Sequence, residues 1–243
     1  MSRVIGIVSV VVGGGSLVAF GGFLWLGSFH CVDLRMDLTG VLIWDGFLSM
    51  VFFMQHSGMI RRSFRRRLAG VVPGHLDHAV YSIGSGVVLS LVLVLWQRSL
   101  IDVVQLEGPW RWPFRIAFVA AVVGFVSGLR ALHGFDGFGL RAIRHRVRGR
   151  QRPEPSLIVD GPYRWVRHPL YSCVLIMIWS CPDLTADRLL FNLLWTGWIV
   201  LGTALEEQDL EADFGERFRA YRRRVPMLVP WTLRPRWPGD GSG

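Results

Sequence analysis

The sequence contains no lysine, only three cysteines and few charged residues. The cysteines, Cys31, Cys173 and Cys181, are too few and too scattered for a disulfide framework or a zinc site, so no metal is expected. Charged residues make up 19% of the 243 positions and hydrophobic residues 51%. Because soluble domains carry about 25% charged residues, this composition argues against a water-soluble enzyme.

The positive charge has one source and an uneven distribution. All 27 basic residues are arginine, and against 18 acidic residues they give a net charge of +9. The arginines cluster between long apolar runs and do not follow one polar face, so nucleic acid is not expected as a partner. The pattern is typical of a multi-span membrane protein with the lipid bilayer as its partner.

Four apolar runs are each long enough to form a membrane-spanning helix, which takes roughly 20 residues. They cover residues 4–26, 41–60, 79–96 and 116–132. The first has no charged residue and no clear cleavage site, so we interpret it as a retained helix and not as a signal peptide. Two further runs, residues 170–181 and 189–205, predict a helical hairpin, because the first is too short to span alone.

The arginine clusters predict the orientation. One cluster begins at Arg61, after the second span, and the other at Arg141, after the fourth. Basic loops face the cytoplasm, so both termini are expected there, in a bacterial-type inner (cell) membrane. We therefore predict an all-α polytopic helix bundle with four spans, a C-terminal hairpin and a cytoplasmic tail. It forms one membrane domain over residues 1–243, in which 1–133 hold the spans and 134–243 the cofactor-binding loop, hairpin and tail.

Polar residues share one face of the second span. Asp45, Ser49, Phe52 and His56 follow helical spacing. Ionisable groups within a span are functional candidates, so His56 is a candidate catalytic residue. The alternative is that Asp45 and His56 lie near opposite ends of the helix, at the level of the lipid headgroups.

Two glycine patterns accompany the fourth span. Gly124 and Gly128 are spaced for close helix packing. His133 begins a run in which aromatic residues alternate with glycines, through Asp136 to Arg141, which suits a tight turn at the membrane surface. A structural role for this turn competes with ligand contact.

The most specific pattern flanks the predicted hairpin. The motif Gly-x-Tyr-x-x-x-Arg-His-Pro-x-Tyr covers residues 161–171, and Glu206 and Glu207 follow the second apolar run. Folding of the hairpin brings both ends to one mouth, where an arginine, a histidine, two tyrosines and two carboxylates meet. Such a set can hold a ligand with charged and aromatic parts.

Together with a later Phe-Gly, a tyrosine and Val-Pro, this motif resembles the membrane methyltransferases related to isoprenylcysteine carboxyl methyltransferase. The resemblance covers residues 161–230. Upstream, the Gln55-His56-Ser57-x-Met59 run, Tyr81 and the run from Phe135 to Arg141 resemble the bacterial methanethiol S-methyltransferases more than the prenylcysteine enzymes.

The resemblance implies S-adenosylmethionine as cofactor and a small apolar thiol as substrate, with methanethiol converted to dimethyl sulfide. It assigns the cofactor to residues on both sides of the hairpin. These are Tyr163, His168, Pro169, Leu170, Tyr171 and Glu206, with Ser156, Leu157 and Ile158 along the adenosine. We also expect Arg167 and Glu207, which lie in the same motif and Glu pair, to hold the cofactor. It places Tyr81, Asp136 and Arg141 near the substrate, with His56 and then His133 as candidate bases for the thiol proton.

Two departures from these families bear on the substrate. The prenylcysteine enzymes carry a substrate-binding arginine about a turn before the Glu pair, where this chain has Gly202 and Thr203. A prenylated carboxylate would therefore lack its cationic partner. The thiol enzymes are expected to read Glu-Arg-Ser-Thr-Tyr where residues 77–81 read Asp-His-Ala-Val-Tyr.

Alternatives to thiol methylation remain at this stage. One is O-methylation of a carboxylate or of a larger lipophilic acceptor. Another is a haem-binding membrane protein, similar to the nitric-oxide-response and carotene-isomerase relatives of this superfamily, with His56 and His133 as axial ligands. A structural membrane protein is the third. The sequence does not predict an oligomeric state.

Overall fold

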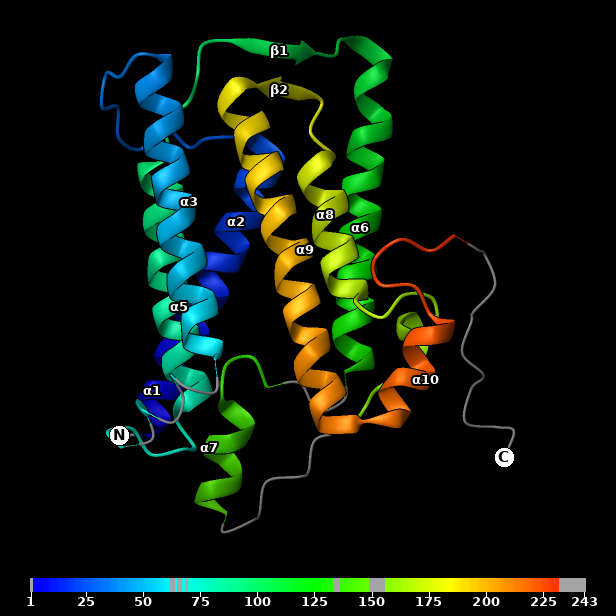
Figure 1. The fold of residues 1–243 in the computed structure, drawn as a ribbon. Coiled ribbons are helices and arrows are strands. Elements are labelled where there is room, and N and C mark those ends of the chain that lie inside the picture. The colour runs from blue at the N-terminus through cyan, green and yellow to red at the C-terminus, as the bar shows by residue number, and fades with distance from the viewer. Residues whose placement is uncertain are drawn as a thin grey trace. The chain divides into compact units, whose positions relative to one another are not determined.

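The structure, a computed structural model, describes residues 2–61, 64, 67–68, 70–132, 136–148 and 156–231. Most of these residues are helical (Figure 1). The chain divides into two compact units. Unit 1 comprises the described residues within Met1–Gln105, Asp136–Glu154 and Asp183–Leu194, and unit 2 those within Leu106–Phe135, Pro155–Pro182 and Trp195–Gly243. Each unit is described by itself.

The first helices of unit 1 form from the apolar runs. The first rod comprises α1 (Ser2–Ser9), a π-helical turn η1 (Val10–Gly14) and α2 (Gly15–Leu26). Two longer helices follow, α3 (Leu38–Ile60) and α5 (Asp77–Leu95), which lie side by side in Figure 1. The helix α3 starts at Asp37, whose carboxylate accepts a hydrogen bond from the Gly40 amide at 3.0 Å.

The first rod and α5 approach each other at their backbones. A Cβ atom on Gly86 would lie 2.8 Å from the Val12 carbonyl oxygen, and one on Gly13 would lie 2.1 Å from the Ser82 hydroxyl. Glycine is therefore required at this crossing. Small residues at helix contacts are typical of membrane bundles, where helices associate through close packing.

The start of α9 (Ala186–Phe214) is anchored in unit 1 by buried charges. The Asp187 carboxylate accepts hydrogen bonds from Trp96 Nε1 at 3.1 Å and from the Ser99 amide at 2.9 Å. The Arg188 guanidinium donates to the carbonyls of Phe23 and Leu24, both at 3.0 Å, near the end of α2. The Leu24 carbonyl belongs to the last turn, whose carbonyls lack partners within the helix, whereas the Phe23 carbonyl also accepts a hydrogen bond from the Gly27 amide.

A small antiparallel sheet was not predicted. The strands β1 (Asp102–Gln105) and β2 (Asp183–Thr185) pair in unit 1, with Asp102 opposite Thr185 and Gln105 opposite Asp183. Both strands are too short to give a periodic signal in the sequence, and their pairing joins segments about 80 residues apart. The sheet connects the segment after α5 with the turn of the predicted hairpin.

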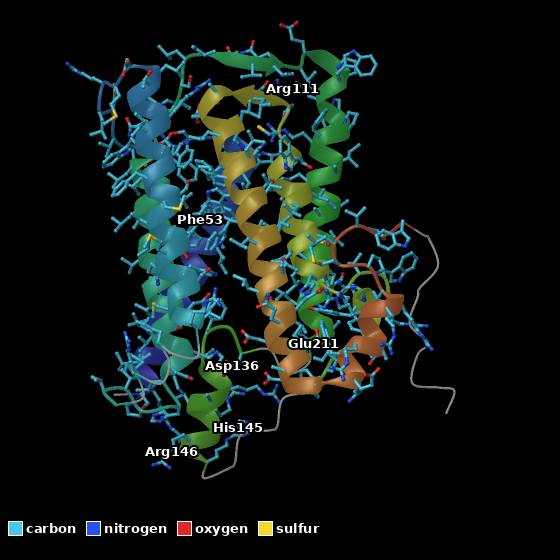
Figure 2. All side chains as sticks on the ribbon, viewed as in Figure 1. Phe53, Arg111, Asp136, His145, Arg146 and Glu211 are labelled. Atoms are coloured by element: carbon cyan, nitrogen blue, oxygen red, sulfur yellow. The ribbon has the colours of Figure 1, made fainter. Side chains whose placement is uncertain are left out.

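A short helix, α7 (Leu140–Val147), packs its apolar side in unit 1. Ile143 is buried with Leu76 and Ala79, and Ile5 packs against this cluster. The helix begins after Gly139, whose φ of +72° favours glycine. His145 and Arg146 lie on its final turn (Figure 2).

Unit 2 contains the remaining helices. They are the 3-10 turn η2 (Gly108–Trp110), α6 (Arg111–Ala131), the 3-10 turn η3 (Gly161–Arg164), α8 (Pro169–Trp179), the later part of α9, and α10 (Glu216–Arg224). The predicted glycine contact on α6 is confirmed, because a Cβ atom on Gly124 would lie 3.0 Å from Cys173 Sγ and one on Gly128 2.8 Å from Leu170 Cδ2. Both neighbours belong to α8.

The prediction of an all-α polytopic membrane protein is confirmed. Five helical segments among the described residues are long and apolar enough to span a membrane: Ser2–Leu26, Leu38–Ile60, Asp77–Leu95, Gly108–Ala131 and Ala186–Phe214. The helix α8 has 11 residues, too short to span, as expected. The second arm of the hairpin is longer than predicted, because α9 continues through Glu206 to Phe214. The interpretation of the chain as one membrane domain stays a prediction.

Candidate functional site

The Arg-His-Pro motif lies in unit 2, at the start of α8. Gly161, with a φ of +58°, allows the sharp entry into η3. Pro169 is the first residue of α8, a position where its missing amide hydrogen costs no helical hydrogen bond. The Arg167 and His168 amides donate to the carbonyls of Pro226 and Met227, at 2.8 and 3.1 Å. The backbone of the motif is therefore held by the segment that follows α10.

Glu207 on α9 contacts the Arg167 and His168 side chains of the motif. Arg167 Nε lies 2.6 Å from Glu207 Oε1, and His168 Nε2 lies 3.2 Å from the same oxygen. Glu207 and His168 are both buried. Arg222 Nε on α10 lies 3.6 Å from Glu207 Oε2. The Arg167 guanidinium also donates to the carbonyls of Arg222 and Val225. A buried carboxylate of this kind is retained because it is paired and hydrogen-bonded.

Glu206 and Tyr171 form a second, exposed contact beside this cluster. The Tyr171 hydroxyl donates to Glu206 Oε2 at 2.8 Å. The Tyr171 and His168 rings stack, with centroids 5.8 Å apart and planes at 25°. The two carboxylates of the pair therefore differ: Glu207 is buried in ionic contacts, whereas Glu206 is exposed at the end of the tyrosine. An exposed carboxylate next to an aromatic ring suits a cationic or hydroxyl-bearing ligand.

A hydrophobic cluster lies next to the motif. It comprises Leu157, Val159, Phe218, Tyr221 and Val225. The Tyr221 hydroxyl donates to the Tyr163 carbonyl. Burial raises the pKa of Tyr221 and of Tyr163, so both phenols stay neutral at physiological pH and retain their hydroxyl hydrogens.

Glu211, one turn after Glu207 on α9, is labelled in Figure 2 and contacts Arg219 and Arg222 of α10.

The structure thus brings together most of the predicted cofactor residues. Arg167, His168 and Glu207 share one cluster, and Tyr171 contacts Glu206. The Leu170 side chain instead packs toward Gly128. Of the predicted adenosine stretch, Ser156 is exposed, Leu157 is buried in the hydrophobic cluster and Ile158 is half-buried. Because the Leu157 side chain is buried, only the backbone of this residue is expected to contact a ligand.

Unit 1 contains two of the other predicted residues in direct contact. The Tyr81 hydroxyl on α5 lies 2.9 Å from His56 Nε2 and 3.1 Å from His56 Nδ1 on α3. The His56 ring packs against Phe52, with centroids 5.0 Å apart. Asp45, Ser49 and Phe52 on the same face are buried, so the predicted shared face of α3 is confirmed. The Asp45 carboxylate accepts a hydrogen bond from the Gln97 amide at 3.0 Å.

In the predicted turn before α7, Asp136 accepts hydrogen bonds from backbone amides. The Asp136 carboxylate accepts a hydrogen bond from the Ala142 amide at 2.8 Å, and its carbonyl accepts one from the Gly139 amide (Figure 2). Asp136 therefore has a structural role at the start of α7, the alternative considered from the sequence. Arg141 is exposed on that helix. His133, the second candidate base, lies outside the described residues.

Sequence reasoning missed two features. Arg222 contacts Glu207, but nothing in the spacing of the arginines of α10 distinguishes it from its neighbours. A cavity in unit 1 is lined by Tyr81 and residues on both sides of the α3–α5 connection, and it arises only from tertiary packing. Among the residues that the structure describes, no group of three or more His, Cys, Asp or Glu side chains is arranged to hold a metal ion.

Comparisons with known proteins give a consistent set of relatives. The chain is 38% identical to a methanethiol S-methyltransferase of Pseudomonas sp. (strain GM41(2012)) over 187 residues, which covers 76% of this chain and 72% of the relative. It is 35% identical to that of Pseudomonas deceptionensis over 202 residues, 82% of this chain and 76% of the relative. It is also 30% identical to nurim of Rattus norvegicus over 201 residues, 76% of this chain and 72% of nurim.

No protein-family model matches the chain, and no solved structure matches it. Identity of this degree over most of both chains nevertheless shows common descent with the curated enzymes. The aligned length includes more than two thirds of each relative. The resemblance inferred from the Arg-His-Pro motif, the Glu pair and the upstream runs is thereby confirmed: the chain belongs to the methanethiol S-methyltransferase family of membrane methyltransferases.

Proposed function

We propose that this protein transfers the methyl group of S-adenosylmethionine to methanethiol and releases dimethyl sulfide. The observation that carries the proposal is the contact of Arg167, His168 and Tyr171 with the Glu pair on α9. The resemblance assigns His168, Tyr171 and Glu206 to the cofactor, and Arg167 and Glu207 are predicted to hold it with them. The similarity to methanethiol S-methyltransferases supports both the reaction and the acceptor.

The chemistry of the exposed groups fits this cofactor. S-adenosylmethionine carries a sulfonium and an ammonium, for which Glu206 supplies a carboxylate and Tyr171 an aromatic face. Glu207 is paired with Arg167 and hydrogen-bonded to His168, so its proposed role is to hold these two side chains in position. The proposed cofactor residues also include Tyr163, Pro169 and the backbone of residues 156–158. Leu170 belongs to the same set, and its side chain packs toward Gly128 of α6.

When bound, the cofactor supplies a methyl group that a thiolate attacks in line. The protein has to position the thiol, exclude water and accept the thiol proton. Thiols with a pKa of about 8.5 are mostly protonated at pH 7, so a nearby base accelerates the reaction. We propose that His56, which hydrogen-bonds to Tyr81, accepts the thiol proton. Asp136, Arg141 and His133 remain assignments from the resemblance.

The membrane setting gives a second part of the proposal. The arginine clusters that begin at Arg61 and Arg141 favour the cytoplasmic side for both termini, in a bacterial-type inner membrane. A volatile apolar thiol reaches such an enzyme through the lipid as well as through water. Labelling of single-cysteine variants at either terminus with a membrane-impermeant reagent tests the orientation. Labelling of intact spheroplasts would contradict it.

No observation favours the alternative acceptors or haem. The Thr203 side chain, at the position where the prenylcysteine enzymes carry an arginine, is buried and donates to the Ile199 carbonyl at 2.6 Å. It offers no cation for a carboxylate substrate. For haem, both ring nitrogens of His56 lie within hydrogen-bonding distance of Tyr81. An axial ligand would require one of them to face the iron.

Headspace chromatography of membranes that contain this protein tests the reaction. Membranes supplied with S-adenosylmethionine and methanethiol are expected to release dimethyl sulfide, whereas membranes from cells that lack the chain release none. Parallel samples with short carboxylic acids and phenols are expected to give no methylated product. Product from these acceptors alone would replace thiol methylation with O-methylation.

A further inference from the structure

A cavity in unit 1 lies next to the His56–Tyr81 contact. It has a volume of about 110 Å³. Its lining combines apolar residues at the end of α3 and beyond with the first turns of α5: Met59, Ile60, Leu68, Asp77, His78 and Tyr81. No residue of the charged cluster in unit 2 contributes to this lining.

The size of the cavity limits what it can hold. Pockets for drug-sized ligands have volumes of about 300–1,000 Å³, and an apolar cavity of about 150 Å³ binds benzene or xenon. A cavity of about 110 Å³ therefore suits a ligand of a few heavy atoms. S-adenosylmethionine and prenylated substrates are far larger than this.

Tyr81 connects the cavity to His56. It lines the cavity and its hydroxyl lies 2.9 Å from His56 Nε2. Among the described residues, His56 does not itself line the cavity. A hydroxyl that donates to the imidazole still has oxygen lone pairs with which to accept a proton from a ligand. The pair is thus arranged to move a proton from the cavity to the imidazole.

We propose that this cavity binds the thiol acceptor in its neutral form, and that Tyr81 passes the thiol proton to His56. The inference rests on the proposed function, and it names the site and the route of proton removal. Tyr81 is then the catalytic residue, because it contacts the thiol. His56 is a positioning residue that acts through Tyr81.

The proton transfer is balanced within these groups. The S–H bond breaks as its proton moves to the Tyr81 oxygen, and the Tyr81 O–H bond breaks as its own proton moves to a His56 nitrogen. The electron pair of the S–H bond stays on sulfur and would form the new bond to the methyl group, while the bond from that methyl group to the sulfonium would break and its electron pair would leave with S-adenosylhomocysteine. The imidazolium afterwards loses its proton to water, which restores the neutral pair.

Asp77 brings a carboxylate to the wall of the cavity. Its carboxylate lies in the lining, where one oxygen accepts a hydrogen bond from the His78 amide at 2.8 Å. A negative charge in the wall disfavours a thiolate in the cavity, because like charges repel in a poorly solvated site. The thiol therefore keeps its proton in the cavity until Tyr81 removes it.

A comparison of methanethiol with methaneselenol tests the proton route. The Se–H group is far more acidic than the S–H group, so a selenol that enters the cavity in its neutral form loses its proton readily and depends far less on a base. Tyr81→Phe keeps the ring and removes the hydroxyl. We expect it to lower kcat/KM for methanethiol by about 100-fold, the scale of general base catalysis, and to change kcat/KM for methaneselenol little. His56→Asn is expected to show the same selectivity.

The matched control is Ser85→Ala. Ser85 lies one helical turn after Tyr81 on α5, and its hydroxyl accepts a hydrogen bond from Gln55 Nε2 at 3.5 Å. Gln55 is the neighbour of His56, so the variant removes a polar contact between the same two helices. It is expected to leave the ratio of thiol to selenol turnover at the wild-type value.

Binding without the methyl donor gives an independent readout. The NMR signal of ¹³C-labelled methanethiol is expected to broaden and shift with purified wild-type protein, and to do so far less with Leu68→Phe, which fills the cavity. Leu91→Phe, on an exposed part of α5, is the control and is expected to retain the wild-type signal.

The outcomes separate this inference from the proposed function. Equal losses for thiol and selenol in Tyr81→Phe, or unchanged thiol binding in Leu68→Phe, would overturn the inference while wild-type dimethyl sulfide production stands. A wild-type protein that methylates neither acceptor would remove the proposed function instead. The selective loss together with the loss of binding supports the inference.

Discussion

The clusters in the two units differ in how they satisfy polar groups. In unit 2, Glu207 is buried within contact distance of Arg167 and His168, and Glu206 is exposed at Tyr171. In unit 1, His56 and Tyr81 form a hydrogen bond beside a small, largely apolar cavity. The charged residues of the unit 2 cluster suit an ionic methyl donor. The small cavity of unit 1 suits a small neutral acceptor.

Each cluster is therefore sensitive to a different kind of substitution. Removal of a charge in unit 2 leaves its partner buried and unpaired, which costs far more than the net gain of the pair. In unit 1, substitutions are expected to act through the fit of packed side chains or through the loss of a single hydroxyl group. The following substitutions test this contrast.

The largest effect is expected for Glu207→Ala. The variant leaves the Arg167 and His168 side chains without their shared carboxylate, and loss of one partner of a buried ion pair costs about 3–5 kcal/mol. We expect low expression and a large fall of Tm in detergent. Arg219→Ala, which breaks exposed contacts on α10, is the control and should change Tm little. Equal Tm values for both variants would contradict the account.

Glu206→Ala is expected to affect the donor and not the fold. Glu206 is exposed, so its removal leaves no buried charge. Loss of a hydrogen bond to a charged group costs about 1.5–3 kcal/mol, which weakens S-adenosylmethionine binding by about 10- to 150-fold. Calorimetric titration measures the affinity, and Tm should stay at the wild-type value. An unchanged affinity would remove Glu206 from the cofactor site.

In unit 1, Gly86→Ala tests packing in place of charge. The new Cβ atom would lie 2.8 Å from the Val12 carbonyl oxygen, so the backbones must separate at a cost of about 1–3 kcal/mol. Gly46→Ala on α3 adds the same methyl group where no atom lies within 4 Å. Thermal unfolding should distinguish the two. A stable Gly86→Ala variant would show that the crossing is looser than described.

The smallest effect is expected for Tyr171→Phe. It keeps the ring that stacks on His168 and removes the hydroxyl that donates to Glu206. One hydrogen bond contributes about 0.5–1.5 kcal/mol, so donor affinity should fall by about 2- to 13-fold. A loss as large as that of Glu206→Ala would indicate that the tyrosine hydroxyl itself contacts the donor.

The sequence predicts some levels of this structure better than others. The long apolar runs predict α3 and α5 to within a few residues, because a membrane helix needs a continuous apolar segment. The spacing of Gly124 and Gly128 predicts a close contact but not its partner, α8. The β1–β2 pair and the buried Arg188 depend on segments far apart in the chain, and no local pattern signals them.

The candidate site shows the same division. The residues of the Arg-His-Pro motif and the Glu pair are found from the sequence, because a helical hairpin brings its two ends together. Which carboxylate is buried does not follow from the spacing, since Glu206 and Glu207 are adjacent. That distinction arises from the position of Arg167, whose backbone is fixed by Pro226. The cavity beside Tyr81 likewise depends on how α3, α5 and Leu68 pack.

Photo-crosslinking locates the donor most directly. Purified protein is irradiated with S-adenosylmethionine labelled in its methyl group, and the modified peptides are identified by mass spectrometry. We expect label on aromatic residues of 163–171, beside Glu206, and its loss in Glu206→Ala. Label confined to the helices of unit 1, at wild-type yield in that variant, would contradict the assignment of the donor to the Arg-His-Pro cluster.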